Sequence, residues 1–131
     1  IMANGTIAFD TLQTSGQISG TAKSVDTDYV VTGSPKSWIA VNQDGTMAIL
    51  DSLNIASITD DGTGKTDATY SANMSSGNYS NLVTAGNSNN KRAHFFEPST
   101  SQQQIEVHQV SANSTDTDST YVCGAALGDL A

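Results

Sequence analysis

The residues best able to carry out chemistry in this sequence are two histidines, His94 and His108, and a single cysteine, Cys123. Zinc prefers imidazole and thiolate ligands, but sequence-recognisable zinc sites are built from close pairs such as Cys-x-x-Cys or His-x-x-x-His. No such pair occurs in this chain. We therefore expect no metal centre and no other cofactor. The apolar neighbours Val122 and Ala125 predict that Cys123 is a small buried side chain.

Acid–base and nucleophilic catalysis also lack a local signature. The chain has two glutamates, Glu97 and Glu106, and no Gly-x-Ser-x-Gly turn, so neither a carboxylate pair nor a Ser/His/Asp triad is indicated. Residues 62–66 end in Gly-Lys-Thr like a phosphate-binding loop, but Thr59 stands where that motif needs its first glycine. A hairpin turn is the better interpretation of this segment. We predict that the protein is not an enzyme.

Aspartates occur in pairs that could bind calcium. Asp26 and Asp28 form one Asp-x-Asp pair and Asp116 and Asp118 form another, while residues 60–61 open a glycine-rich turn. The EF-hand type of calcium loop, with its closing glutamate, is missing. We therefore expect these carboxylates to cap turns through hydrogen bonds to nearby backbone N–H groups.

The aromatic residues could form a stacking platform for carbohydrate; they are Trp38, Tyr29, Tyr70, Tyr79 and Tyr121. Each lies within or beside a predicted strand, so burial in the fold or at a subunit contact is the preferred interpretation. Loops carry recognition on rigid β scaffolds. We expect a binding loop at residues 86–92, with its polar and basic members as the contact residues: Asn87, Asn89, Asn90, Lys91 and Arg92.

Apolar and polar side chains alternate along much of the chain, which predicts β-strands. We therefore expect strands to position the residues named above. In residues 104–110, Ile105 and Val107 share one face and Glu106 and His108 the other. Residues 53–59 are predicted as a single strand with Leu53 and Ile55 on one face and Ile58 on the other. Further strands are expected at residues 6–9, 28–32, 37–41, 46–50, 66–70, 79–85, 92–96 and 120–127. Short strands separated by Gly/Asn/Asp turns predict an all-β protein, an antiparallel β-sandwich or its jelly-roll variant.

The composition decides how this sandwich reaches stability. Leu, Ile, Val and Phe supply 25 of 131 residues, and the net charge is −8, a combination that by itself leans toward disorder. The 17 Ser, 16 Thr, 10 Asn and 11 Gly are interspersed with short apolar runs, as in β proteins with many turns. We predict one sandwich domain at residues 28–131, preceded by a strand and extended arm at residues 1–27. Because the apolar core is thin, we expect an oligomer whose interface completes it.

Charge and hydropathy exclude several partners. Thirteen acidic residues against five basic ones repel phosphate backbones, so nucleic acid is not an expected partner. No apolar run is long enough for a membrane-spanning helix, and no basic-then-apolar secretory leader is present at the start of this sequence. We expect no insertion into a membrane. The stretch from Met2 resembles a natural start of translation, which predicts a complete small gene product.

The order of segments in the middle of the chain resembles a known family. A strand with Lys36 and Trp38 precedes residues 51–64, Asp-Ser-Leu-Asn-Ile-Ala-Ser-Ile-Thr-Asp-Asp-Gly-Thr-Gly, and Asn78-Tyr79 follows after a further strand. This pattern is similar to that of bacteriophage tail-fibre and virion appendage proteins, as is the C-terminal Ala-Ala-Leu-Gly-Asp. Leu53 replaces the aromatic residue usual in that family.

The resemblance implies a structural virion protein that assembles as a homotrimer, contacts other virion proteins and presents loops to a host-surface glycan or protein. It leaves open where on the virion the chain lies. A head fibre or a capsid-decorating protein that braces the shell is the alternative to a tail appendage. A carbohydrate-binding or carbohydrate-active module is a third hypothesis from a different class.

Overall fold

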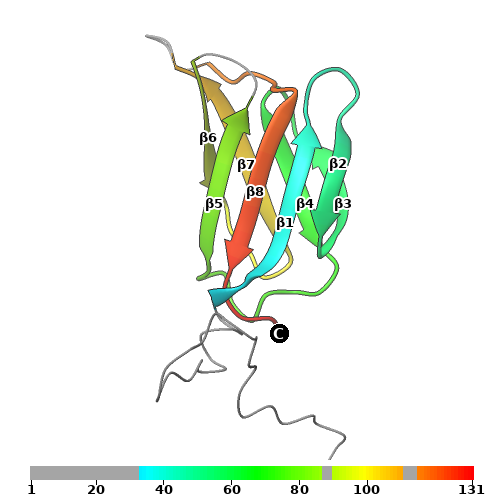
Figure 1. The fold of residues 1–131 in the computed structure, drawn as a ribbon, viewed down its shortest axis with the longest axis vertical. Coiled ribbons are helices and arrows are strands. Elements are labelled where there is room, and N and C mark those ends of the chain that lie inside the picture. The colour runs from blue at the N-terminus through cyan, green and yellow to red at the C-terminus, as the bar shows by residue number, and fades with distance from the viewer. Residues whose placement is uncertain (1–32, 87–89, 111–114) are drawn as a thin grey trace, which may run out of the picture.

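The computed structural model describes residues 33–86, 90–110 and 115–131. Eight strands in these ranges form two antiparallel four-stranded sheets that pack as a sandwich (Figure 1). Sheet A has the order β2-β1-β8-β5 and sheet B the order β3-β4-β7-β6. The strands are β1 (Pro35–Asn42), β2 (Ala48–Leu53), β3 (Ile55–Asp60), β4 (Lys65–Tyr70), β5 (Ser80–Gly86), β6 (Lys91–Phe96), β7 (Gln102–Gln109) and β8 (Tyr121–Leu127).

The predicted antiparallel β-sandwich is confirmed. The strand order defines the topology, for which the sequence had also allowed a jelly-roll variant. Within one sheet, hairpins join β1 to β2, β3 to β4, and β6 to β7. The predicted arm at residues 1–27, and the strands predicted at residues 6–9 and 28–32, lie outside the described residues.

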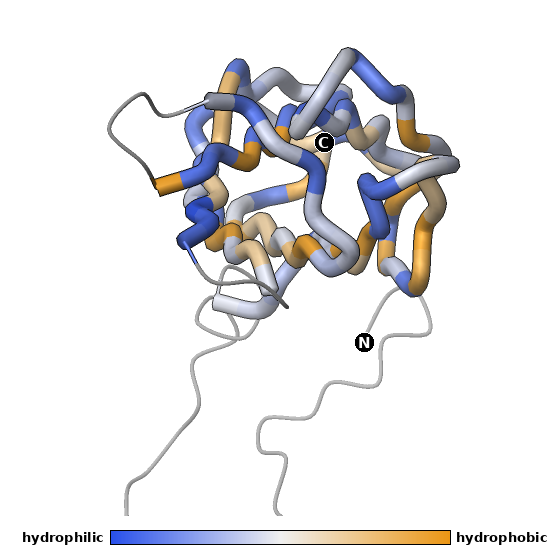
Figure 2. Tube along the Cα trace, turned by 90° about the horizontal axis from the view of Figure 1, so that it is seen from above, coloured by the Kyte–Doolittle hydropathy of each residue, from blue (hydrophilic) through white to orange (hydrophobic). Residues whose placement is uncertain are grey.

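The core lies between the two sheets, which Figure 2 shows from above as two layers. The alternation in β7 is as predicted, since Ile105 and Val107 are fully buried against the inner face of sheet A. The remaining buried members of this cluster are Ile39, Val41, Ala68 and Val122. These side chains are aliphatic, and a second buried cluster consists of Tyr70, Met74 and Ala126.

One predicted strand is broken in the structure. Residues 53–59 do not form one strand, because Asn54 adopts a left-handed backbone conformation (φ 58°) and turns the chain from sheet A into sheet B. The Asn54 side chain holds this corner by accepting a hydrogen bond from the Ala72 N–H at 2.7 Å and donating one to the Ala72 carbonyl at 3.0 Å. Leu53 therefore points to solvent while Ile55 and Ile58 both pack against the core, contrary to the predicted shared face of Leu53 and Ile55.

A buried glutamine joins the two sheets at one end of the sandwich. Gln43, 2% exposed, donates from Nε2 to Thr66 Oγ1 at 3.0 Å and accepts from the Ser119 N–H at 3.3 Å. Its own backbone N–H donates to the Ser119 carbonyl at 2.9 Å. The side chain thus connects the end of β1 with β4 and with the segment leading into β8.

We expect Gln43→Ala to lower the free energy of unfolding by about 1–3 kcal/mol, because the Ser119 N–H and the Thr66 hydroxyl lose a buried partner. Urea denaturation at a fixed protein concentration measures this loss. Gln109→Ala is the matched control, since Gln109 is exposed in β7, and it should change stability by no more than about 0.5 kcal/mol. Equal effects of the two substitutions would contradict a clamping role for Gln43.

Candidate functional site: the apolar face of sheet A

The outer face of sheet A carries an apolar row that crosses all of its strands. Trp38 in β1 pairs with Leu53 in β2 on one side and with Ala125 in β8 on the other, and Ala125 pairs with Leu82 in β5. Directly paired residues of antiparallel strands point to the same face of a sheet, so these four side chains lie side by side. The row follows from the alternation in each strand, because the neighbours of these residues in sequence, such as Ile39 and Val83, face inward.

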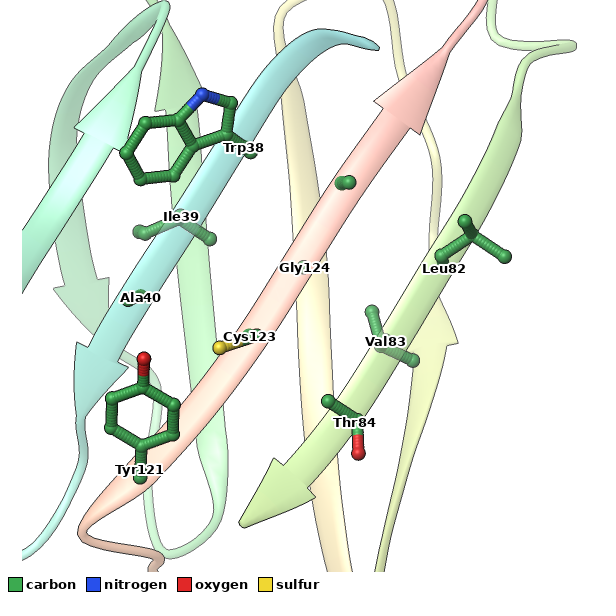
Figure 3. A pocket seen from close by; sticks show the side chains of 10 residues that line it. Trp38, Ile39, Ala40, Leu82, Val83, Thr84, Tyr121, Cys123 and Gly124 are labelled. Atoms are coloured by element: carbon green, nitrogen blue, oxygen red, sulfur yellow. The ribbon is translucent and has the colours of Figure 1, made fainter.

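A second row runs parallel to the first and is built from small side chains. Asp51, Ala40, Cys123 and Thr84 are paired in this order across β2, β1, β8 and β5. Small residues in the central strands leave a shallow hollow of about 370 Å³ between larger neighbours. Figure 3 shows the rings of Trp38 and Tyr121 on one side of this hollow and Leu82 on the other, with Cys123 between them. We call these two rows and Tyr121 the apolar face of sheet A.

Large apolar side chains on this face are exposed to water. Leu82 is 63% exposed, Leu53 49% and Tyr121 45%. Single exposed apolar residues are ordinary on protein surfaces, but contiguous apolar patches mark sites of interaction. Asp51 is the charged member of the two rows. A side-chain hydrogen bond with Cys123 is the first cause that raises the pKa of the Tyr121 phenol above its ordinary value.

Cys123 is half-buried at the floor of the hollow, on the outer face of the sheet. We predicted a buried position from its apolar neighbours, Val122 and Ala125. That prediction did not take into account that Val122 and Cys123 must point to opposite faces of β8. Val122 occupies the core and Cys123 the outer surface.

The outer face of sheet B holds a compact charged cluster. Lys65 in β4, Glu106 in β7 and His94 in β6 are paired across three neighbouring strands. Glu106 Oε1 lies 3.2 Å from Lys65 Nζ, and its Oε2 lies 2.9 Å from His94 Nε2 and 3.4 Å from His108 Nε2. Burial opposes the ionisation of Glu106, but stabilising interactions, of which the hydrogen bond with Lys65 is the largest, outweigh burial and hold its pKa below the ordinary value. We call His94, Glu106 and His108 the histidine–glutamate cluster.

The histidine–glutamate cluster was missed by reasoning from local spacing. His94 and Glu106 are twelve positions apart and meet because β6 and β7 are paired with His94 opposite Glu106. His108 lies on the same face of β7 two residues further on. The usable signal was the Glu-x-His spacing on one strand face together with a histidine in the preceding predicted strand. The register that brings them together was not visible in the sequence.

The predicted binding loop lies partly within the described residues. Asn87 and Asn89 fall outside them, whereas Asn90 is exposed and in a left-handed conformation (φ 64°) just before β6. Lys91 begins β6 and donates a hydrogen bond from Nζ to the Asp118 carbonyl, so its charge is engaged within the fold. Arg92 is exposed and pairs in register with His108. Binding by this loop remains a prediction.

Asp60, Asp116 and Asp118 have structural partners. Asp60 Oδ1 accepts a hydrogen bond from the Gly62 N–H at 3.0 Å, as expected for a capped turn, and the segment from Gly62 forms the predicted hairpin turn between β3 and β4. Asp118 Oδ1 accepts from the Gly64 N–H at 2.6 Å. Asp116 lies beside the histidine–glutamate cluster, 3.1 Å from His108 Nδ1. Asp26 and Asp28 lie outside the described residues.

Comparison of the chain with protein-family models, with curated proteins and with solved structures found no match. Among the described residues, no helix is long and apolar enough to cross a membrane. The function must therefore be inferred from the chain's own residues and geometry.

Proposed function

We propose that this chain is a structural virion protein of a bacteriophage, a fibre or appendage module that assembles as a homotrimer through the apolar face of sheet A. The observation that carries the proposal is the apolar row from Leu53 to Leu82, which crosses every strand of that sheet. The resemblance of residues 51–64 to tail-fibre proteins supplies the virion context and the threefold symmetry.

Electrostatics favours this face as the contact between copies. Each chain carries a net charge of −8, so like chains repel one another over most of their surface. Association is least opposed where the surface is apolar and nearly uncharged, because desolvating it is favourable and few like charges are brought together. The rows of the apolar face of sheet A meet both conditions, with Asp51 at one edge.

The dimensions of the face approach those of a standard interface. Four strands at about 4.8 Å spacing and about seven residues of about 3.4 Å each give a face of roughly 20 by 24 Å. That is of the same order as the roughly 800 Å² that each partner contributes to a standard protein interface. Burying this face would supply the apolar area that the small core between the sheets lacks.

The start of β1 and the end of β8 lie at one end of the sandwich, and the predicted binding loop joins strands at the other, as expected for a module attached at one end (Figure 1). The described chain enters β1 and leaves after β8 at the same end of the sandwich, whereas β5 ends and β6 begins at the opposite end (Figure 1). The predicted binding loop at residues 86–92 therefore joins strands at the end far from both the entry and the C-terminus. In a trimer this places three copies of the loop on one side, where several weak contacts act together to raise avidity for a host surface.

Sedimentation equilibrium tests the assembly. The wild-type chain should be a trimer at micromolar concentration, and Leu82→Asp should weaken association by more than about 100-fold, because burying an unpaired carboxylate costs several kcal/mol. Val110→Asp is the matched control, since Val110 is 53% exposed outside sheet A. A monomeric wild-type chain would refute the assembly, and an intact trimer in Leu82→Asp would place the interface elsewhere.

Antibody labelling of phage particles from the source, viewed by electron microscopy, tests the virion role separately. Label on a tail appendage supports the proposal. Label over the capsid surface would favour the head-fibre or shell-bracing alternative, and particles without label would refute a virion protein of either kind.

A further inference from the structure

The histidine–glutamate cluster has the spacing of ligands around a single small cation. His94 Nε2 lies 2.9 Å from Glu106 Oε2, His108 Nε2 lies 3.4 Å from the same oxygen, and the two Nε2 atoms are 3.3 Å apart. Ligands at about 2.0–2.1 Å from a tetrahedral zinc ion are separated by about 3.3 Å, since the edge of a tetrahedron is about 1.6 times the centre-to-corner distance. Two of the three separations match this value and the third is shorter.

We propose that His94, Glu106 and His108 bind a divalent transition-metal ion of the zinc class on the outer face of sheet B. Two imidazoles and one carboxylate are a known zinc ligand set, and imidazole donors select against magnesium and calcium, which prefer oxygen. The three side chains provide three ligand atoms within 4.8 Å of one another. Water completes the coordination from the solvent side, where the His94 side chain is 41% exposed.

Neighbouring side chains orient two of the three ligands. Asp116 Oδ1 lies 3.1 Å from His108 Nδ1, so this ring nitrogen donates to the carboxylate and leaves the Nε2 lone pair facing Glu106. Lys65 Nζ holds the other Glu106 oxygen at 3.2 Å and leaves Oε2 for the ion. A carboxylate behind a histidine ligand is the usual outer-shell partner in zinc sites, where it fixes the ring and increases its basicity.

A cation also removes an electrostatic conflict in this cluster. With its proton on Nδ1, the neutral His108 turns an Nε2 lone pair toward the Glu106 oxygen, which is itself an acceptor. The Glu106 side chain is only 9% exposed, so water screens this contact poorly. Either a proton or a metal ion between the two acceptor atoms makes the arrangement favourable. A titration that measures metal binding directly distinguishes these two possibilities.

Binding requires a small movement of the more exposed ring. The two imidazoles are stacked, with ring centroids 4.4 Å apart and planes inclined by 20°, so their Nε2 lone pairs run nearly side by side. A metal ion must lie close to the plane of each ring that it binds. His94, at the sheet edge on β6, can rotate to meet this condition, while His108 is held by Asp116. The bound ion would link edge strand β6 to β7.

Isothermal titration of zinc chloride into chelator-treated, tag-free full chain tests the proposal. We expect a single site, and His94→Gln should abolish most of its affinity while far-UV circular dichroism stays unchanged. Asp116→Asn should weaken binding by about 10–100-fold, as for outer-shell partners in other zinc sites. Asp44→Asn is the matched control: it removes one exposed carboxylate between β1 and β2 of sheet A, whereas the cluster lies on sheet B, and it should leave zinc affinity unchanged. Magnesium chloride should not bind at this site.

Two outcomes would overturn the proposal: no saturable zinc binding by the wild-type chain, or binding that His94→Gln leaves undiminished. Cobalt(II) titration of the wild-type chain gives a second readout if the variant does not fold. Intense visible absorption from a low-coordinate cobalt centre is expected, and the weak absorption of hydrated cobalt would count against the site. The apolar face of sheet A is on the opposite sheet, so the metal test and the trimer test can fail independently.

Discussion

Replacing Gly64 by alanine should lower the free energy of unfolding by about 3–5 kcal/mol, the largest loss we expect from any single substitution described. Gly64 has φ +72°, and a Cβ at this position would lie 2.5 Å from the Val107 carbonyl oxygen and 2.8 Å from the Thr117 nitrogen. Both are backbone atoms that pair with each other, since the Thr117 N–H donates to the Val107 carbonyl at 3.0 Å. Neither can move without breaking that hydrogen bond. Urea denaturation at a fixed protein concentration measures the loss.

Gly45→Ala separates the two causes of this loss. Gly45 has φ +71°, nearly the angle of Gly64, but a Cβ there would meet no heavy atom within 4 Å among the described residues. Its replacement should cost only the left-handed strain of about 1–2 kcal/mol. The excess cost at Gly64 then measures the clash with the backbone of residues 107 and 117. Similar losses at both glycines would mean that the close approach at Gly64 is not restrictive.

The second large effect is expected at Ile105, where Ile105→Ala should cost about 2–5 kcal/mol through lost burial and the cavity left behind. Ile105 is fully buried, and its Cδ1 occupies the space where Gly124 on the facing sheet has no side chain. A Cβ at Gly124 would lie 2.8 Å from that Cδ1, but 3.5 Å from Val83 Cγ1 and 3.6 Å from Gln103 Nε2. The clash therefore comes from one methyl group of Ile105.

This packing predicts a change of sign in a double-mutant cycle. Gly124→Ala alone should destabilise the protein by about 1–3 kcal/mol, because it overpacks the core against Ile105. In the Ile105→Ala background the same substitution should stabilise, since the Cβ enters the new cavity at ordinary contact distances. Denaturant unfolding of the four proteins measures the cycle. Additive effects would show that Ile105 and Gly124 do not share this space.

The two outer faces of the sandwich differ because different types of side chain occupy the outward-facing positions of their strands. The outer face of sheet A carries tryptophan, leucine and small residues. The outer face of sheet B carries Lys65, Glu106 and His94, which are paired across neighbouring strands. Under the proposed function, the first face is covered by other copies of the chain and the second stays in contact with solvent. A metal ion on sheet B would then stabilise an exposed edge strand without affecting assembly.

Much of the fold could be predicted because its causes are local. The strands predicted at residues 37–41, 66–70, 79–85, 92–96 and 120–127 correspond to β1, β4, β5, β6 and β8, with ends that differ by a few residues. Alternation and turn residues act over a few positions, so they can be read from a short segment. The strand predicted at residues 53–59 corresponds to β3 but starts at Ile55, because the chain turns at Asn54, whose side chain bonds to Ala72, eighteen positions away.

The candidate sites were predictable only in part. Glu106 and His108 were correctly placed on the outward face of a strand opposite Ile105 and Val107, because side chains alternate with a period of two. Their meeting with His94 depended on the register between β6 and β7, and the apolar row from Leu53 to Leu82 depended on the order of four strands from distant parts of the chain. Register and strand order are set by packing between segments far apart in sequence.

The sequence by itself therefore determined the class of fold, the positions of most strands and the side of each strand on which a residue lies. Only the tertiary structure decided which outward residues become neighbours. The two histidines first considered as isolated ligands are adjacent to a buried glutamate, and the tryptophan first considered as a buried aromatic or subunit contact lies in an exposed apolar row. The physical reason is that alternation is a property of one strand, whereas a site on a sheet surface requires several strands in register.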